Sequence, residues 1–262
     1  MTGLLRSELT KILTTRLWWG LLIGVVIYTG LQAGATAALA GLDPGAGQPA
    51  SPGLDNPATI RSVYAMSAFT GSYVFALVLG VTGMTGEYRY QTITPTFLAT
   101  PRRARVVLGK AGANLVMGVG YGVVAAVAAV IVGALVIAIR GDALGLGTPG
   151  LLRAVLLAIL AVALWTLLGL GIGTLIRNQV AAILVAVATA FIVEPLVGLA
   201  LAAADLDEIA KFLPSSASSA MTSPASSLVD LLPWWGGAMV LVGYAVLFAG
   251  VGLLLTTRRD IT

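Results

Sequence analysis

The sequence predicts an all-α integral membrane protein with six transmembrane helices, an N-terminal interfacial helix, and a short cytoplasmic helix between spans 2 and 3. Hydrophobic residues make up 58% of the 262 residues and charged residues only 10%, whereas soluble domains carry roughly 25% charged residues. The apolar residues form runs of about 20 residues or more, the length that crosses a bilayer. Most basic residues fall in alternate connections between these runs. Lipid is therefore the predicted solvent of this chain.

The first element, residues 1–16, is predicted to be a cytoplasmic helix that lies in the plane of the membrane. One helical face holds the apolar residues Leu5, Leu9, Ile12 and Leu13. Polar residues occupy much of the remaining surface, which is typical of an interfacial helix. A basic flank that only enforces the topology is the alternative interpretation. The polar residues that we assign to this element are Arg6, Glu8, Lys11 and Arg16.

Residues 17–262 are predicted to form a single transmembrane domain. The predicted spans are about 17–40, 63–84, 111–139, 151–176, 180–203 and 237–256. The first apolar run exceeds the roughly 7–15-residue core of a signal peptide, and no convincing cleavage site follows it. We interpret this run as a retained span. Only Arg177, Asn178 and Gln179 separate the fourth run from the fifth, which predicts a tight helical hairpin.

Lysine and arginine are distributed unequally between the two sides of the predicted domain. Because basic loops remain in the cytoplasm, this asymmetry predicts that both termini are cytoplasmic, in a bacterial inner membrane. The amino-terminal side holds eleven of these residues: Arg6, Lys11, Arg16, Arg89, Arg102, Arg103, Arg105, Lys110, Arg177, Arg258 and Arg259. The opposite side holds four: Arg61, Arg140, Arg153 and Lys211.

Two outer connections and several glycine pairs predict further features. Residues 41–60 are rich in Gly and Pro and are predicted to be irregular. Residues 204–236 join a polar part to an apolar part with Trp234 and Trp235, and re-entry of this segment into the membrane is one interpretation. Glycines four residues apart predict close helix contacts. The pairs are Gly20/Gly24, Gly30/Gly34, Gly118/Gly122 and Gly169/Gly173.

The connection at residues 85–110 is the longest predicted inner loop. Thr94 can cap the free N–H groups of a helix, and Pro95 suits the first helical position. Pro101 then disfavours helical geometry at Thr100. This pattern predicts a helix of about five residues between charged flanks.

Such a helix exposes Phe97 and Leu98 on the cytoplasmic side, which is unfavourable unless a partner covers them. A docking plug for a partner protein is one interpretation. The other is that the segment lies on the headgroups, with Arg102, Arg103 and Arg105 attracted to anionic lipid. The residues alone leave both interpretations open.

The chain has no recognisable catalytic apparatus. Cysteine and histidine are absent, which excludes disulfides, thiolate or imidazole metal sites, and nucleophiles paired with histidine. The only Gly-Lys pair, Gly109-Lys110, lacks the first glycine and the following Ser or Thr of a P-loop. We therefore expect no enzyme activity and no cofactor or metal in this chain. We also expect no nucleic-acid binding, because the basic residues follow the topology instead of lining one exposed face.

Several residues around the inner loop form a recognisable pattern. They are Glu87, Arg89, Thr92, Leu98, Thr100, Pro101, Arg103 and the Gly109-Lys110 pair, together with Glu8, Lys11 and Arg16 before the first span. On these residues the chain resembles permeases of the ABC-2 type, and the resemblance extends over the whole chain in length, span count and topology. The family often has Gly before the matching Thr, where this chain has Gln91.

The resemblance implies that residues 1–16 form an elbow along the inner surface, and that the inner loop forms a coupling helix inserted into a cleft of a separate ABC ATPase subunit. The implied docking residues are Glu87, Tyr88, Arg89, Thr92, Thr94, Pro95, Phe97, Leu98, Pro101 and Arg103. ATP and Mg²⁺ are then expected on the partner ATPase. A second permease copy or paralogue is also implied, because six spans are half the complement of such a transporter.

The implied function is ATP-driven export by alternating access of an amphipathic or hydrophobic small molecule, such as a drug, antibiotic, lipid or lipopeptide. An ATPase-independent secondary transporter or channel is the alternative, as is a non-transporting membrane scaffold. A secondary transporter predicts charged relays or inverted repeats within the membrane. The sequence offers one intramembrane carboxylate and no clear repeat.

That carboxylate is Glu194, which Pro195 follows near the outer half of the fifth predicted span. An ionisable group at the bilayer centre costs about 2.5–3.5 kcal/mol on insertion scales and is a candidate functional site. The alternative is a carboxylate that reaches the outer surface, where it pairs with Arg140 or Arg153.

Overall fold

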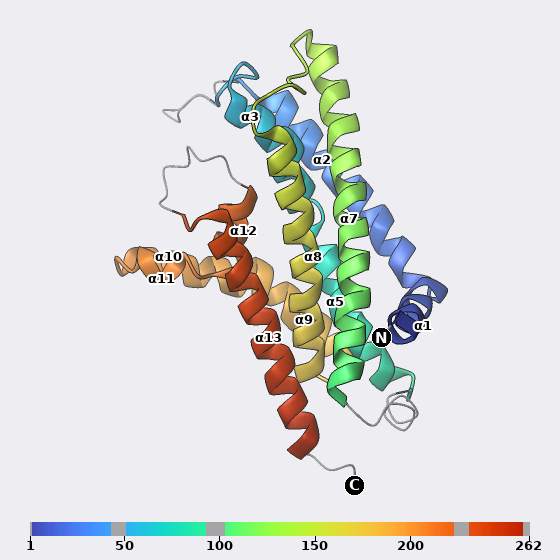
Figure 1. Cartoon of the computed structure of the whole chain (residues 1–262). Helices are drawn as coiled ribbons and strands as arrows, with labels where there is room; N and C mark the ends of the chain where they lie inside the picture. Colours follow the sequence, from blue (N-terminus) through green and yellow to red (C-terminus); the bar gives the residue numbers. More distant parts are fainter. Residues whose placement is uncertain (1, 43–50, 93–102, 223–230, 259–262) are drawn as a thin grey trace.

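The structure, a computed structural model, describes residues 2–42, 51–92, 103–222 and 231–258, and these residues form helices without a strand (Figure 1). The first half comprises α1 (Thr2–Thr14), α2 (Leu17–Leu39), α3 (Pro57–Arg61), the π-helical turn η1 (Ser62–Met66), α4 (Ser67–Thr70), α5 (Tyr73–Arg89) and α7 (Arg103–Arg140). The second half comprises α8 (Leu151–Leu175), α9 (Gln179–Ala188), the π-helical turn η2 (Thr189–Val193), α10 (Glu194–Ala203), α11 (Asp207–Ala210), α12 (Pro214–Thr222) and α13 (Trp234–Arg258).

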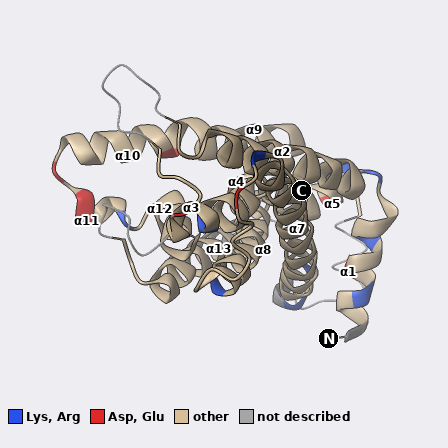
Figure 2. Cartoon of the chain, turned by 90° about the horizontal axis from the view of Figure 1, so that it is seen from above, with Lys and Arg blue, Asp and Glu red and all other residues tan. Residues whose placement is uncertain are grey.

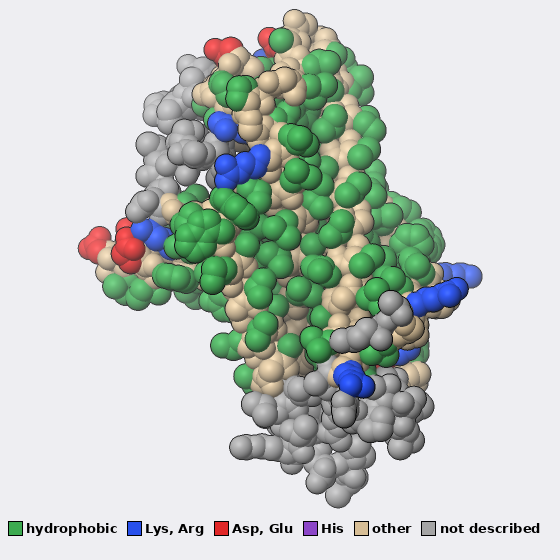
Figure 3. Space-filling model, viewed as in Figure 1, with side chains coloured by type: hydrophobic (Ala, Val, Ile, Leu, Met, Phe, Trp, Pro, Cys, Tyr) green, Lys and Arg blue, Asp and Glu red, His purple; other side chains and the backbone are tan. Residues whose placement is uncertain are grey.

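Six helical stretches in the described residues are long and apolar enough to cross a membrane. They are Leu17–Leu39, Pro57–Arg89, Arg105–Arg140, Leu151–Leu175, Gln179–Ala203 and Trp234–Gly252. Each overlaps one of the predicted spans, which confirms the prediction of a multi-pass, all-helical membrane protein. Hydrophobic side chains cover much of the outer surface of these helices (Figure 3).

The second and third spans extend furthest beyond their predicted limits. The second begins at Pro57 instead of residue 63, because the side chain of Asn56 caps the helix by accepting a hydrogen bond from the N–H of Ala58 at 2.8 Å. The third is part of α7, which has 38 residues and is therefore about 57 Å long at 1.5 Å per residue. That length is nearly twice the roughly 30 Å of a bilayer core. One end of α7 therefore reaches past the membrane, and Lys110 lies near its start.

The fifth span is bent. The π-helical turn η2 interrupts it, and Pro195 follows in the first turn of α10. In Figure 1, α10 leaves the bundle sideways, and the view from above shows α10 and α11 extending away from the other helices (Figure 2). Since π-helical turns locally disrupt the regular hydrogen-bond ladder, η2 accounts for the change in course.

The chain returns to the bundle through α12, which packs against α8 and α13. The indole N–H of Trp165 donates a hydrogen bond of 2.7 Å to the hydroxyl of Ser218. Because Trp165 lies near the middle of α8, α12 lies beside the middle of a spanning helix. Re-entry of residues 204–236 into the membrane stays a prediction.

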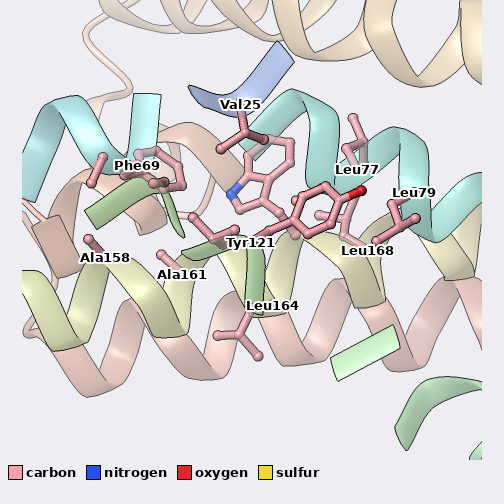
Figure 4. Close-up of a cluster of buried hydrophobic side chains, with 14 of the residues drawn as sticks. Val25, Phe69, Leu77, Leu79, Tyr121, Ala158, Ala161, Leu164 and Leu168 are labelled. Atoms are coloured by element: carbon pink, nitrogen blue, oxygen red, sulfur yellow. The ribbon is translucent and has the colours of Figure 1, made fainter. Parts of the chain in front are cut away.

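Helix α8 forms the centre of the bundle, with α5, α7 and α13 around it (Figure 1). Figure 4 shows side chains from several of these helices meeting in the core, among them Leu77, Tyr121 and Leu168. Glycines allow the closest approaches: Gly118 of α7 faces Ala163, and Gly169 of α8 faces the backbone of Leu77. These helix contacts were predicted from the glycine spacing.

The other predicted glycine pairs differ in their contacts. Gly30 and Gly34 of α2 both face Val132 of α7, and Gly24 faces Phe75 of α5. Gly20, however, has open space around it. Spacing alone therefore overestimates the contacts of the Gly20/Gly24 pair.

Candidate functional site

Four charged side chains from three helices meet beside the predicted docking loop, and we call them the charge cluster: Glu8 and Lys11 of α1, Glu87 of α5 and Lys110 of α7. The Nζ atom of Lys110 lies 2.7 Å from Oε2 of Glu8 and 2.8 Å from Oε1 of Glu87. The Nζ atom of Lys11 lies 2.7 Å from Oε1 of each carboxylate. Each amine therefore bridges both carboxylates, and the formal charges cancel.

Three members of the charge cluster are withdrawn from solvent. Lys110 is 2% exposed, Glu8 3% and Glu87 4%. Lys110 also donates a hydrogen bond of 3.2 Å to the carbonyl oxygen of Gly83. A buried ion whose partner is removed is strongly destabilising, by about 3–5 kcal/mol. The cluster therefore resists separation of the three helices that carry it.

Lys11 is the member that solvent reaches, with 44% of its side chain exposed. Burial acts to lower its pKa, but hydrogen bonds and charge attraction from Glu8 and Glu87 outweigh burial and raise the pKa above its usual value. A raised pKa in the folded state means that the stabilisation is complete below the usual lysine pKa and is lost as the pH rises through the raised value. Lys11 therefore stays charged and paired at neutral pH.

An open hollow of about 340 Å³ lies against the charge cluster between α1 and α5. Its wall includes Thr82, Gly86, Tyr90 and Thr92, together with members of the cluster. Tyr90 and Thr92 lie at the start of the inner loop, where the described part of that loop ends. The hollow therefore opens at the base of the predicted docking segment.

The C-terminus of α5 sets the direction in which the chain enters this loop. Gln91 adopts a left-handed conformation with a φ of 58°. The N–H of Thr92 donates to the carbonyl of Glu87 at 3.0 Å, and the N–H of Gln91 donates to the carbonyl of Tyr88 at 3.4 Å. These are the two hydrogen bonds of a Schellman motif, in which glycine is the usual left-handed residue. Gln91 therefore occupies a position that favours glycine, the residue that the resembling family often has there.

Replacing Gln91 with glycine is expected to raise stability by about 0.5–1 kcal/mol, because glycine adopts positive φ without the steric cost of a Cβ. Thermal unfolding of the purified protein would measure the gain, with Gln91→Ala as the control that keeps a Cβ. Equal midpoints for the glycine and alanine variants would contradict the prediction.

The remaining predicted docking residues divide into two groups. Tyr88 and Arg89 face the turn between α8 and α9: Arg89 donates a hydrogen bond of 3.1 Å to the side-chain oxygen of Gln179, and the guanidinium of Arg177 lies 5.9 Å from the ring centre of Tyr88. Outside the described residues lie Thr94, Pro95, Phe97, Leu98 and Pro101. Arg103 is the first residue of α7, and the structure describes its backbone but not its side chain.

Three of the predicted elbow residues, Arg6, Glu8 and Lys11, are on α1, which is a separate helix set at an angle to α2 (Figure 1), whereas Arg16 is the N-cap of α2. Its apolar residues Leu4 and Leu5 contact Gly109 and Gly112 of α7. Arg6 and Arg16 are exposed, whereas Glu8 and Lys11 enter the charge cluster. The helix is therefore held by α7 as well as by its charges.

Glu194, the predicted intramembrane polar residue, is 6% exposed and does not reach the outer surface. Its carboxylate accepts a hydrogen bond from the backbone N–H of Ser215, in the first turn of α12. In the described residues no ion pair joins it to Arg140 or Arg153. Arg140 instead pairs with Asp142 at 3.3 Å, and Arg153 lies 5.7 Å from the ring centre of Trp234.

The alternative interpretation, in which Glu194 reaches the outer surface and pairs with Arg140 or Arg153, is therefore not what the described residues show. The bend at η2 places Glu194 beneath the returning segment α11–α12 instead of at the end of a straight span.

Sequence reasoning named all four members of the charge cluster without predicting that they meet. Two features of the sequence point to unusual charges. Lys110 lies within two turns of the start of a long helix, and Glu8 lies on a helix with an apolar face. Neither signal identifies a partner, because the approach of α1 to α5 and α7 is a tertiary contact. The sequence matches no protein-family model and no curated protein.

Proposed function

We propose that this chain is the membrane subunit of an ATP-driven exporter, and that the charge cluster couples a docked ATPase to the spanning helices. The observation that carries the proposal is that Glu87 and Lys110, which flank the inner loop, bind each other and the N-terminal helix at 2.7–2.8 Å. A displacement of the loop therefore acts on three helices at once.

The route from the loop into the bundle is short. Helix α5 leads from the loop to α8, against which it packs through glycines on both helices, Gly80 and Gly169. Helix α8 in turn contacts α7 and α13. Because close-packed backbones leave little room for independent movement, a shift of α5 is expected to move the centre of the bundle.

The proposed orientation places the inner loop, both chain ends and the turn at Arg177 in the cytoplasm of a bacterial cell. The described parts of these features, α1, the end of α5, the start of α7, the turn between α8 and α9 and the end of α13, share one end of the bundle in Figure 1, and most of the basic residues lie in or next to these segments. Helix α1 then lies along the inner membrane surface, where Arg6 and Arg16 meet anionic lipid headgroups. Lipid is accordingly a further partner of the chain.

The proposed cargo is an amphipathic or hydrophobic small molecule, which suits an interior built mainly from apolar side chains with a few buried polar groups. ATP and Mg²⁺ belong to the separate ATPase in this proposal. A second permease copy or paralogue completes the pathway, and α10 presents exposed apolar residues such as Leu196 and Leu199 that such a copy can cover.

Substitution of Phe97 or Leu98 by aspartate is expected to abolish co-purification of an ATPase, because a carboxylate in an apolar docking cleft leaves a buried charge unpaired. The protein would be purified from its own host in mild detergent without crosslinking, and bound subunits quantified by mass spectrometry. We expect the wild type to retain ATPase in equal number and both variants to lose it.

The matched control is Leu146→Asp, which changes an exposed leucine in the connection at the opposite end of the bundle. This variant is expected to keep the ATPase. Retention of the ATPase by Phe97→Asp and Leu98→Asp would refute docking through this loop. Absence of an ATPase from the wild type would instead favour a secondary transporter, a channel or a scaffold.

A further inference from the structure

A second cavity, of about 180 Å³, lies on the far side of the bundle from the charge cluster. Helices α5, α8, α9, α10 and α13 contribute to its wall, together with the start of α12. Three aromatic side chains line it: Trp165, Tyr244 and Phe248. The rest of the lining is aliphatic apart from Thr189 and Glu194. Glu194 is the charged residue of this cavity.

The carboxylate of Glu194 is buried without a cation. It is 6% exposed, and no lysine or arginine of the described chain forms an ion pair with it. Ser215 hydrogen-bonds to it through both its backbone N–H and its side chain. Buried charges in proteins are normally paired with an opposite charge. A buried carboxyl group without such a partner either keeps its proton or takes up a cation, and the space beside Glu194 can hold the cation.

The aromatic walls are suited to supply the rest of a cation site. Rings of Trp, Tyr and Phe attract cations over their faces, and the ring of Trp165 is held in place by Tyr73, whose ring centre lies 4.7 Å away. The indole N–H of Trp165 is bonded to Ser218, which leaves its ring as an apolar surface. A carboxylate and fixed aromatic rings around one small volume form a binding site for an organic cation.

The wall nearest Glu194 includes the π-helical turn η2, whose residues Thr189, Ala190 and Val193 line the cavity. Single π-helical turns occur frequently at functional sites, where they reposition side chains. Here the turn ends immediately before Glu194 and directs α10 away from the bundle. The same distortion thus creates the space and places the carboxylate at its edge.

We propose that this cavity binds a small lipophilic monocation, such as a protonated primary amine that carries one aromatic ring. The ammonium group pairs with Glu194, and the ring lies against Trp165, Tyr244 and Phe248. This inference goes beyond the proposed function, because binding at this cavity requires neither an ATPase nor transport.

A purely structural role for Glu194 makes a different prediction. If the carboxylate serves only to cap α12, any side chain that accepts a hydrogen bond from Ser215 will replace it. Glutamine has such an acceptor, because its amide oxygen lies nearly where a carboxylate oxygen of glutamate lies, but it carries no charge. Glu194→Gln therefore distinguishes a role in capping α12 from a role in binding a cation.

The test compares two probes of similar size, 2-phenylethylamine, which is protonated at pH 7, and the neutral 2-phenylethanol. Binding to the purified full chain in detergent would be measured by calorimetry and by quenching of tryptophan fluorescence, with empty micelles as the blank. We expect the wild type to bind the amine about tenfold or more tightly than the alcohol, since hydrogen bonds to charged groups are the stronger ones.

Glu194→Gln is expected to reduce the affinity for the amine to the level of the affinity for the alcohol. The affinity for the alcohol is expected to stay unchanged. A second variant, Ala186→Leu, places a larger side chain in the cavity from a buried position on its wall. It is expected to lower the affinity for both probes. Equal affinity of the wild type for the two probes, or an unchanged preference for the amine in Glu194→Gln, would overturn the proposal. Neither result bears on ATPase docking, and loss of docking does not bear on this site.

Discussion

Substitution of Lys110 by methionine is expected to destabilise the protein by about 3–5 kcal/mol, the range for removing one partner of a buried ion pair. Glu8 and Glu87 are 3% and 4% exposed, so both carboxylates would remain buried with only Lys11 as a partner. Thermal unfolding in detergent, followed by tryptophan fluorescence, measures the loss. In the complex with an ATPase, the same variant is expected to abolish the stimulation of ATP hydrolysis by cargo while the ATPase stays bound.

Lys11→Met is the matched control for this variant. Lys11 contacts nearly the same carboxylate oxygens, but 44% of its side chain is exposed, so water can take over part of the solvation that Lys11 gives the two carboxylates, whereas Lys110 is shielded from water. A much smaller loss is therefore expected. Equal losses for the two variants would show that burial of Lys110 is not what makes the charge cluster strong. Loss of the bound ATPase in Lys110→Met would show that the charge cluster is needed for docking of the ATPase. It would contradict the proposed role, which is to couple an already docked ATPase to the spanning helices.

Replacement of Gly169 by leucine is expected to prevent the close packing of α5 on α8. A Cβ at Gly169 would overlap the carbonyl oxygen of Leu77, and a Cβ at Gly80 would overlap the carbonyl oxygen of Thr166. Overpacking against side chains costs typically about 1–3 kcal/mol, and a backbone carbonyl within a helix cannot rotate away as a side chain does. The expected result is little or no monodisperse protein in size-exclusion chromatography.

Gly120→Leu provides the control, because Gly120 lies on an exposed face of α7 with open space around it. Leucine is a better helix former than glycine by roughly 0.8 kcal/mol, so this variant is expected to be neutral or slightly more stable. A well-behaved Gly169→Leu protein with an unchanged unfolding temperature would contradict the proposed contact between α5 and α8.

The spans follow from properties that act along the chain. An apolar run of about 20 residues partitions into lipid whatever its neighbours are, which is why the predicted and observed spans overlap from Leu17 to Gly252. Helix ends depend on local side chains as well. The second span was predicted from its apolar run to begin at residue 63, but the cap at Asn56 starts the helix six residues earlier, at Pro57.

The contacts of the charged residues depend on packing between helices. The sequence drew attention to Glu8 and Lys11 through the interfacial helix, and to Glu87 and Lys110 through the pattern around the inner loop. It does not show that α1 approaches α5 and α7. Glu194 was recognised because an ionisable group within a span is costly, and its hydrogen-bond partner, Ser215 of α12, comes from the chain that returns after the π-helical turn. Hydrophobicity and charge along the chain are sufficient to predict which segments enter the membrane. The pairing of charges far apart in sequence requires the packed helices, because an ion pair forms only where packing brings both groups within about 4 Å and excludes the water that would otherwise solvate them.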